Sequence, residues 1–252
     1  MKRFGWLPPT VFVAICVVGW EVAVRRQSVP IIPGPWEVLE GIAELGRRGL
    51  LVKYIVASLF RVTWGYLLAV ATAIPLGLYL GGHRRAEMAV NPAIQILRPI
   101  SPLAWIPIAI LWFGVGDLAA IFLIFLASFL PLTVSAMNAV RNIPVIYVQA
   151  GMNFGLSQRQ LVWKVLYPAV LPQLIVGLRL ALGIAWLVVV AAEMIAVNSG
   201  LGFLIIDSRN AGNRYDLVVA GMVLIGMIGL LLDTGMRSLE KVRSLRWGYG
   251  TD

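Results

Sequence analysis

The chain has 252 residues and a formal net charge of +9, and 60% of its residues are hydrophobic whereas 13% are charged. Soluble domains carry roughly 45–50% apolar and about 25% charged residues, so this composition indicates an all-α membrane protein with several spans in a single domain. With one histidine, His83, and one cysteine, Cys16, an internal disulfide is excluded, and a metal cluster or a Cys–His nucleophile pair is not expected. The positive charge fits topology determination and anionic lipid heads better than nucleic acid.

Six stretches are long and apolar enough to cross a bilayer, which takes about 20 residues as a helix. They cover residues 8–24, 55–80, 88–112, 118–140, 171–197 and 217–236. The first contains Glu21 near its end and no small-residue cleavage site follows, which favours a membrane helix over a signal peptide. The third contains Pro92, Pro99, Pro102 and Pro107 and is therefore expected to be irregular.

A short helix is expected between the first two spans, at residues 33–46. Pro33-Gly34-Pro35 predicts a turn, and Pro35 suits the first position of a helix. Apolar residues would then share one face and acidic residues another, namely Trp36, Leu39 and Ala43 against Glu37, Glu40 and Glu44. Such a helix either lies in a membrane interface or packs on the protein without a role of its own.

Six spans place both termini on the same side of the membrane. If that side is the cytoplasm, eleven Lys and Arg residues lie inside and seven outside, in the direction of the positive-inside rule. The inside set is Lys2, Arg3, Arg84, Arg85, Arg141, Arg159, Lys164, Arg237, Lys241, Arg243 and Arg246, and the outside set is Arg25, Arg26, Arg47, Arg48, Lys53, Arg209 and Arg214. We therefore expect both termini and residues 143–168 in the cytoplasm, and the short helix at 33–46 on the periplasmic side.

A polar segment, VQAGMNFGLSQRQLVWKVLYP, separates the fourth and fifth spans. Ser157 and Gln160 have the spacing of a capping box, which predicts that a helix begins at Ser157. Gly155 suits the end of a preceding helix, and Pro168 is expected to stop the second one. The resulting helical hairpin either lies against its own bundle and the lipid heads or docks a soluble partner, and local chemistry leaves both interpretations open.

The hairpin resembles a cytoplasmic loop of binding-protein-dependent ABC importer permeases, whose pattern is E-A-A-x3-G-x9-I-x-L-P. At that spacing the chain has Gln149-Ala150-Gly151, then Gly155, then Val165-Leu166-Tyr167-Pro168. Ala150, Gly155 and Pro168 match outright, and Val165 is a conservative change. Gln149, Gly151 and Tyr167 depart from the pattern, and the loss of the leading carboxylate removes any salt bridge from that position. A glutamine there still donates and accepts hydrogen bonds.

Further segments are similar to the nitrate, sulfonate, taurine and bicarbonate branch of these permeases. They are LRPISPLAWIP at residues 97–107, Trp112-Phe113-Gly114, Gly177-Leu178-Arg179-Leu180, Ala185-Trp186, Ala191-Ala192-Glu193-Met194 and Gly200-Leu201-Gly202. With Pro33-Gly34-Pro35 included, the likeness covers nearly the whole chain.

This resemblance implies a type I importer of a bacterial inner membrane. Two permease subunits, expected here as a homodimer, would form the pathway in contact with membrane lipid. Two cytoplasmic ATPase subunits would bind ATP and Mg²⁺, and a solute-binding protein would deliver the substrate. The chain itself would be no enzyme and would bind no cofactor, and it contains no GxxxxGK[ST] motif. The implied ATPase-coupling residues are Gln149, Ala150, Gly151, Gly155, Ser157, Val165, Tyr167 and Pro168.

The irregular third span supplies the first candidates for the translocation pathway. Broken membrane helices often face the substrate route of a transporter, which singles out Arg98, Ser101 and Trp105. Alternatively, Arg98 snorkels to the inner membrane face. Arg61 in the second span is expected to snorkel to the outer face.

Arg179 and Glu193 interrupt the fifth span and are further pathway candidates. A charge at the centre of a membrane helix costs about 2.5–3.5 kcal/mol on insertion scales, so a role is the default hypothesis. The two residues are 14 positions, or about 21 Å, apart along a helix and do not pair with each other. Glu193 is expected to meet an outer-loop arginine such as Arg209, or the binding protein, as a structural ion pair or as a gate.

The branch resemblance points to a small anion as the substrate, with nitrate or an organosulfonate such as taurine first and bicarbonate next. Two copies of Arg98 near a shared axis would favour an anion. The branch also includes permeases for uncharged or cationic pyrimidine-like compounds, which is the alternative. An ATP-independent channel or secondary transporter would not need a capped hairpin and would often show internal repeats. The chain lacks the His, Cys and carboxylate clusters of a membrane enzyme.

Overall fold

The structure, a computed structural model, describes residues 7–26 and 32–240, and in these ranges the chain forms helices and no strand. The helices are α1 (Leu7–Arg25), α2 (Pro35–Arg47), α3 (Leu50–Gly82), α4 (Arg84–Leu97), η1 (Pro102–Trp105), α5 (Ile106–Phe113), α6 (Asp117–Arg141), α7 (Val145–Asn153), α8 (Gln158–Leu161), the π-helical turn η2 (Val162–Leu166), α9 (Tyr167–Ala196), α10 (Leu201–Asn210) and α11 (Tyr215–Glu240). Five residues of the charge count lie outside the described ranges, namely Lys2, Arg3, Lys241, Arg243 and Arg246.

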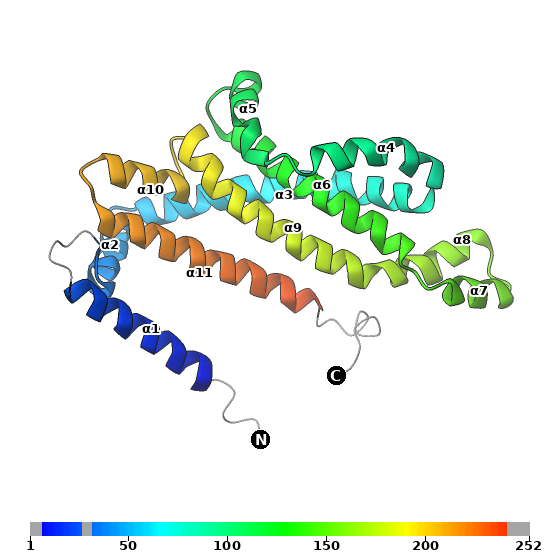
Figure 1. The fold of residues 1–252 in the computed structure, drawn as a ribbon, viewed down its shortest axis with the longest axis horizontal. Helices are drawn as coiled ribbons and strands as arrows, with labels where there is room; N and C mark the ends of the chain where they lie inside the picture. Colours follow the sequence, from blue (N-terminus) through cyan, green and yellow to red (C-terminus); the bar gives the residue numbers. More distant parts are fainter. Residues whose placement is uncertain (1–6, 27–31, 241–252) are drawn as a thin grey trace.

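Four long helices, α3, α6, α9 and α11, make up the body of the molecule, and α6 and α9 lead to the hairpin of α7 and α8 (Figure 1). We call the end with α7 and α8 the hairpin end, and the end with α2 and α10 the opposite end. α6 packs against both α3 and α9, and small residues permit this close approach. A Cβ at Gly77 of α3 would lie 2.5 Å from the Thr133 carbonyl oxygen of α6, and a Cβ at Gly177 of α9 would collide with the Ser135 hydroxyl. Glycine is therefore required at both contacts.

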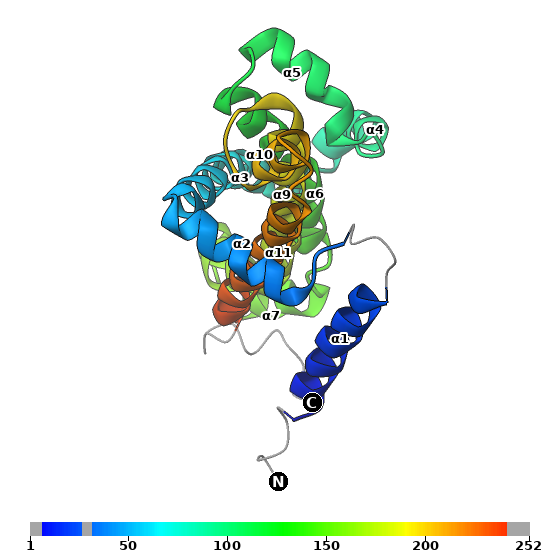
Figure 2. The ribbon, with the colours of Figure 1, turned by 90° about the vertical axis from the view of Figure 1, so that its left-hand side faces the viewer.

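Four helical segments of the described ranges are long and apolar enough to cross a membrane. They are Leu50–Gly82, Asp117–Arg141, Gln158–Ala196 and Tyr215–Ser238, and the bent pair of α4 with η1 and α5 brings the number to five if it forms one span. Helix α1 occupies the first predicted stretch and lies beside the bundle (Figure 2). The fold is thus all-α with several membrane helices, whereas the count of six spans stays a prediction.

The third predicted stretch consists of two segments that are bent by 85° relative to each other. Pro99 and Pro102 flank the break, because neither has an N–H group to continue the helical ladder. Pro92 is accommodated inside α4, and Pro107 lies in the first turn of α5, where a backbone N–H has no intrahelical partner to lose. The irregularity of this stretch is therefore confined to one short connection.

Helix α2 packs on α11 through a different face from the one that its sequence suggested. Its buried residues are Val38, Gly41 and Leu45. Trp36 and Leu39, of the predicted apolar face, are instead 70% and 57% exposed. The helix therefore has both a packing face and an exposed apolar edge, which suits a position in a membrane interface.

Pro168 does not end the second helix of the hairpin, contrary to the sequence prediction. The helix that begins at Gln158 passes through η2 and continues as α9 to Ala196. In η2 the Tyr167 N–H donates to the Val162 carbonyl, five residues back, and Pro168 then lies in the first turn of α9. A π-helical turn shifts the hydrogen-bond pattern, so that the missing N–H of proline breaks no bond. The hairpin is therefore continuous with the long helix α9.

Candidate functional sites

The hairpin between α6 and α9 turns at Gly155. Its φ of +73° lies in the left-handed region, which favours glycine. The Gly155 N–H donates to the Met152 carbonyl at 2.9 Å, and the Leu156 N–H donates to the Gly151 carbonyl at 3.1 Å. These two bonds form a Schellman motif, which satisfies the last carbonyl groups of α7.

A capping box and a close contact hold the two arms of the hairpin together. The predicted capping box is confirmed, because the Gln160 N–H donates to Ser157 Oγ at 3.4 Å and the Ser157 N–H donates to Gln160 Oε1 at 3.0 Å. A Cβ at Gly151 would lie 2.5 Å from Leu161 Cδ1 and 3.4 Å from Val165 Cγ2. The buried Leu161 side chain therefore accounts for glycine at a position where the importer pattern has alanine.

The surface of the hairpin mixes polar side chains with large exposed apolar ones. Phe154, beside the turn, is 86% exposed, and Ile146, Met152 and Trp163 are largely exposed too. Exposed polar residues such as Gln149 lie between them in the sequence, and the hairpin projects beyond the long helices (Figure 1). Exposed apolar area on a polar element marks a surface that suits contact with another protein.

The eight residues that the sequence suggested for coupling belong to this one element. Gln149, Ala150 and Gly151 lie in α7, Gly155 and Ser157 at the turn, Val165 in η2, and Tyr167 and Pro168 at the start of α9. Gln149 and Tyr167 are exposed, whereas Gly151 is buried. Coupling by these residues stays a prediction.

A cavity of about 210 Å³ lies at the break between α4 and η1. Arg98 and Trp105 line it, together with Leu126, Ala127, Leu130 and Pro131 of α6 and Ile184 of α9. These residues lie near the middle of their helices, so Arg98 is level with the helix centres rather than with either end. Among the described residues Arg98 has no ion-pair partner. Ser101 does not line the cavity, and its Oγ accepts the Leu103 N–H at 3.3 Å to cap η1.

Arg179 of α9 forms a bidentate ion pair with Asp233 of α11. Its Nε donates to Oδ1 at 2.5 Å and its Nη2 donates to Oδ2 at 3.1 Å. Arg237 lies 3.1 Å from the same carboxylate. Arg179 does not line the Arg98 cavity, so the two arginines belong to separate sites.

Arg61 and Glu193 form a buried ion pair at the opposite end. Arg61 Nη1 lies 2.7 Å from Glu193 Oε1, and the two side chains are 3% and 0% exposed. The prediction that Arg61 snorkels to the membrane surface is therefore wrong, and so is the pairing of Glu193 with Arg209. Both failed because the partners lie in α3 and α9, 132 residues apart in sequence, and only the packing of these helices brings them together.

Neighbouring groups satisfy the remaining hydrogen-bonding atoms of this pair. The carboxylate accepts a bond from Ser58 Oγ at 2.8 Å and one from the Gly202 N–H at 3.0 Å. The guanidinium donates to the Ser199 carbonyl at 2.7 Å and to Asp117 Oδ1 at 2.8 Å. A buried ion pair is tolerated when such bonds accompany it. The network links α3, α6 and the connection between α9 and α10.

Sequence reasoning missed Ser58, Asp117 and Ser199 as members of this network. The available signal was the Gly200-Leu201-Gly202 motif. Gly200 has a φ of +107°, and a Cβ there would collide with the Glu193 carboxylate. A Cβ at Gly202 would collide with the Val190 carbonyl. The two glycines therefore let the backbone after α9 pass close to the buried Glu193 carboxylate.

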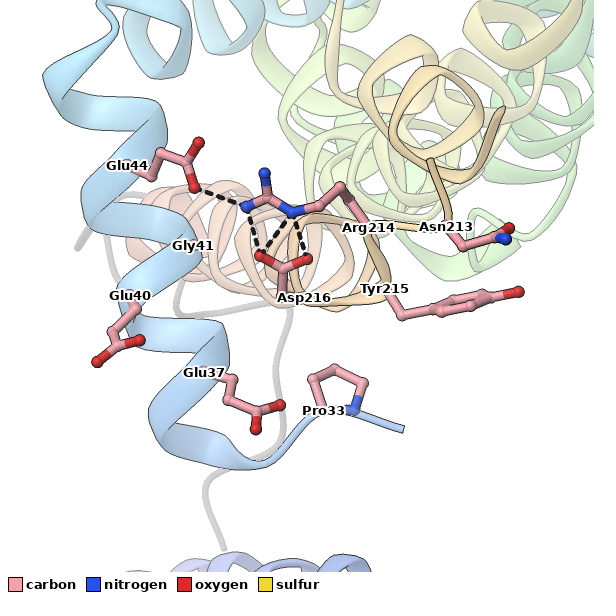
Figure 3. Close-up of a pocket in the computed structure, with 9 residues that line it drawn as sticks. All are labelled: Pro33, Glu37, Glu40, Gly41, Glu44, Asn213, Arg214, Tyr215 and Asp216. Carbon is pink, nitrogen blue, oxygen red and sulfur yellow. Dashed lines mark hydrogen bonds and ion pairs between the residues drawn. The ribbon is translucent and has the colours of Figure 1, made fainter. Parts of the chain in front are cut away.

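A polar pocket of about 380 Å³ lies at the opposite end, between α2 and the connection from α10 to α11 (Figure 3). Arg214 bridges Glu44 and Asp216, with N–O distances of 2.6 Å and 2.7 Å. The hydrogen bond from Arg214 lowers the pKa of the Glu44 carboxyl, and its bonds to both carboxylates raise the pKa of Arg214. Glu37 and Glu40 lie along the same helix without a bond to Arg214 (Figure 3). The cluster therefore clamps α2 to the start of α11.

The described part of the chain is an all-helical bundle with several apolar helices long enough to cross a membrane and a capped hairpin between two of them. Within residues 7–26 and 32–240, no group of three or more His, Cys, Asp or Glu side chains is placed to hold a metal ion. Residues 73–243 match the family described as binding-protein-dependent transport system inner membrane component. The chain belongs to this family, whose members are permease subunits of ABC importers.

Named relatives are similar over most of the chain. The putative ABC transporter permease protein MJ0413 of Methanocaldococcus jannaschii is 39% identical over 234 residues, which cover 90% of this chain and 87% of that protein. The taurine transport system permease protein TauC of Escherichia coli is 35% identical over 235 residues, or 90% and 84% of the two chains. The nitrate import permease protein NrtB of a Synechocystis species is 32% identical over 244 residues, or 93% and 88%. The resemblance to the nitrate, sulfonate and taurine branch is thereby confirmed.

Solved structures of the MetNI methionine ABC transporter in inward-facing conformations have the same fold. One has a TM-score of 0.64 at 18% identity and covers 84% of this chain and 97% of that chain. A second has a TM-score of 0.66 at 20% identity and covers 77% and 96%. The predicted type I importer permease fold is thereby confirmed.

Proposed function

We propose that the chain is the membrane-spanning subunit of an ATP-driven importer that carries a small anion into the cytoplasm by alternating access. Two copies form the pathway, two ATPase subunits bind the hairpin ends, and an extracytoplasmic solute-binding protein meets the opposite end. Both termini and the hairpin then face the cytoplasm, as the distribution of Lys and Arg predicts. Membership of the permease family and the named relatives support this assembly.

The hairpin carries the ATPase-coupling part of the proposal. Hydrogen bonds at Gly155 and Ser157 fix its turn, and its second arm is continuous with α9. A displacement of the turn by the ATPase would therefore be transmitted directly to a long membrane helix. Phe154 is exposed at the tip and offers an apolar anchor of the kind that dominates protein interfaces.

Co-purification of the ATPase with the Phe154→Asp variant tests the coupling role. We expect severalfold weaker retention of the ATPase, because a charged group would replace the apolar anchor. Val115→Asp is the matched control, since Val115 is also an exposed apolar residue but lies in the connection before α6, at the other end of that helix. Equal retention of the ATPase by both variants would contradict docking through the hairpin tip.

Arg98 supports an anion as the substrate. It is a cation at the level of the helix centres, it lines a cavity, and no carboxylate of the described residues neutralises it. Such a charge is expensive in lipid, at about 2.5–3.5 kcal/mol on insertion scales, so its position favours a water-filled route. Trp105 and the apolar wall beside Arg98 leave room for a carbon chain next to the charged group, which suits an organosulfonate such as taurine as well as nitrate or bicarbonate.

The contacts of Arg179 and Glu193 support structural roles for these two pathway candidates. Asp233 engages the charge of Arg179, and Arg61 engages that of Glu193. We therefore retain Arg98, Ser101 and Trp105 as the proposed pathway residues, with Ser101 acting through the cap that it provides for η1.

A panel of ligands tests the substrate assignment. The measurement is ATP hydrolysis by the reconstituted complex in the presence of its binding protein. We expect stimulation by nitrate or by organosulfonates, with bicarbonate next. Stimulation by a pyrimidine, with none by these anions, would contradict the assignment and favour the pyrimidine-like alternative.

A further inference from the structure

A second cavity, of about 360 Å³, opens at the hairpin end where α3, the end of α6 and the start of the η2–α9 helix meet. Aliphatic side chains form most of its wall, among them Leu78 of α3, Val140 of α6 and Leu166 of η2. No residue of the Arg98 cavity lines it. Its shape and lining therefore suit an apolar occupant that is distinct from the transported anion.

Aromatic rings lie at this cavity. Tyr79 stacks on His83 with ring centroids 4.4 Å apart, and both line it. Tyr167 also lines it and lies 5.7 Å from the ring of Trp163. Tyr79, Trp163 and Tyr167 are largely exposed. Tyrosine and tryptophan concentrate at the membrane–water interface, which favours a position of this cavity at the level of the lipid head groups.

Two arginines follow His83, which lines this cavity. Arg84 and Arg85 come directly after His83, and successive Cα atoms are about 3.8 Å apart, so the Cα atoms of both arginines lie within about 8 Å of the Cα atom of this lining residue. Neither has an ion-pair partner among the described residues, and Glu87 of the same turn is engaged by Arg141 at 2.5 Å. Cations in the first turn of α4 oppose the helix dipole, so they do not serve the stability of that helix.

We propose that this cavity binds an acyl chain of an anionic phospholipid whose phosphate lies against Arg84 and Arg85. Basic pockets between membrane helices on the cytoplasmic side bind such head groups. A free phosphate would leave the aliphatic wall empty, and a zwitterionic lipid would gain less from the two cations. The lipid would fill the base of the hairpin and hold α3 and α6 against it. The inference rests on the proposed function only in placing the hairpin end in the cytoplasmic leaflet.

Gly82 permits a substitution that fills the cavity without removing a contact. It lines the cavity, and a Cβ there would meet nothing within 4 Å. Leucine also has a higher helix propensity than glycine, so Gly82→Leu should fold. Gly46→Leu is the matched control, because Gly46 of α2 is equally open but lies at the opposite end. Arg84→Gln with Arg85→Gln removes the charges and leaves the wall intact.

The test measures lipid binding to the delipidated full chain in detergent by native mass spectrometry, with equal amounts of phosphatidylglycerol and phosphatidylcholine. We expect a preference of roughly tenfold for phosphatidylglycerol in the wild type and in Gly46→Leu, since each cation near an anionic lipid contributes to affinity. Gly82→Leu should lose most of the bound phosphatidylglycerol, and the double glutamine variant should lose the preference.

Two results would overturn the proposal. One is equal binding of the two lipids by the wild type, and the other is undiminished phosphatidylglycerol on Gly82→Leu. The measurement needs neither ATP hydrolysis nor uptake, so a failure of the transport assignment would leave its outcome unchanged, and a failure of lipid binding would leave the transport assignment standing.

Discussion

Replacing Arg61 with methionine would leave the fully buried Glu193 carboxylate with only the Ser58 hydroxyl and the Gly202 N–H as partners. Removal of one member of a buried ion pair costs about 3–5 kcal/mol, because the other charge stays unpaired. For a chain of this length, 1 kcal/mol shifts the melting temperature by about 2–4 °C, so we expect a decrease of roughly 6–20 °C. Thermal unfolding of the detergent-solubilised protein measures it.

Two further variants make this measurement decisive. The double variant Arg61→Met with Glu193→Leu should recover much of the loss, since apolar replacement of a whole buried pair is often nearly neutral. Arg179→Met breaks a partly exposed pair and should cost only about 0.2–1 kcal/mol. An Arg61→Met protein that melts no lower than Arg179→Met would refute the view that the network at the opposite end is buried and strongly coupled.

Four other outcomes are expected. Gly155→Glu should abolish uptake while the protein stays in the membrane. Gly49→Glu should retain uptake, because Gly49 also has a left-handed φ, of +71°, and equally open surroundings but lies at the opposite end. Equal loss of uptake in both variants would point to backbone strain alone. Arg98→Gln should reduce transport more than ATP hydrolysis, and equal loss of both with poor expression would favour a structural role. Cysteines introduced at residues 144–166 should be labelled from the cytoplasm only, and labelling from outside would overturn the topology. The pKa of Glu44 is lowered in the folded protein, so its bond to Arg214 stabilises the folded state at pH values above the pKa of Glu44 in the unfolded chain, and this contribution is lost as the pH falls through the lowered pKa. The difference in melting temperature between wild type and Glu44→Gln should therefore shrink on acidification. A difference that stays constant with pH would argue against this ion pair.

Short-range patterns in the sequence predicted the geometry of the hairpin. The capping box at Ser157 and the left-handed Gly155 depend on bonds between residues at most five apart, so the local pattern specifies them. Pro168 shows the limit of such rules. Proline disturbs the hydrogen bonds of an α-helix, but the π-helical turn before Pro168 removes the conflict, and nothing in the local pattern indicates that turn.

The pairing of charged residues far apart in the chain could not be predicted from the sequence. The charges of Arg61 and Glu193 are conspicuous in apolar helices, but their partners follow from the packing of α3 on α9, which depends on small residues spread along several helices. The burial of Val38 and Leu45 in α2, in place of the face with Trp36, depends likewise on where α11 lies. Periodicity identifies such helices without fixing which side they bury.

Uptake into proteoliposomes tests the central claim most directly. The permease, its ATPase and the binding protein are reconstituted, with taurine or nitrate outside and ATP enclosed at the hairpin side. We predict accumulation against a gradient that requires both ATP and the binding protein and that is lost in Gly155→Glu but kept in Gly49→Glu. Equal uptake without ATP would contradict it and would indicate a channel or a secondary transporter.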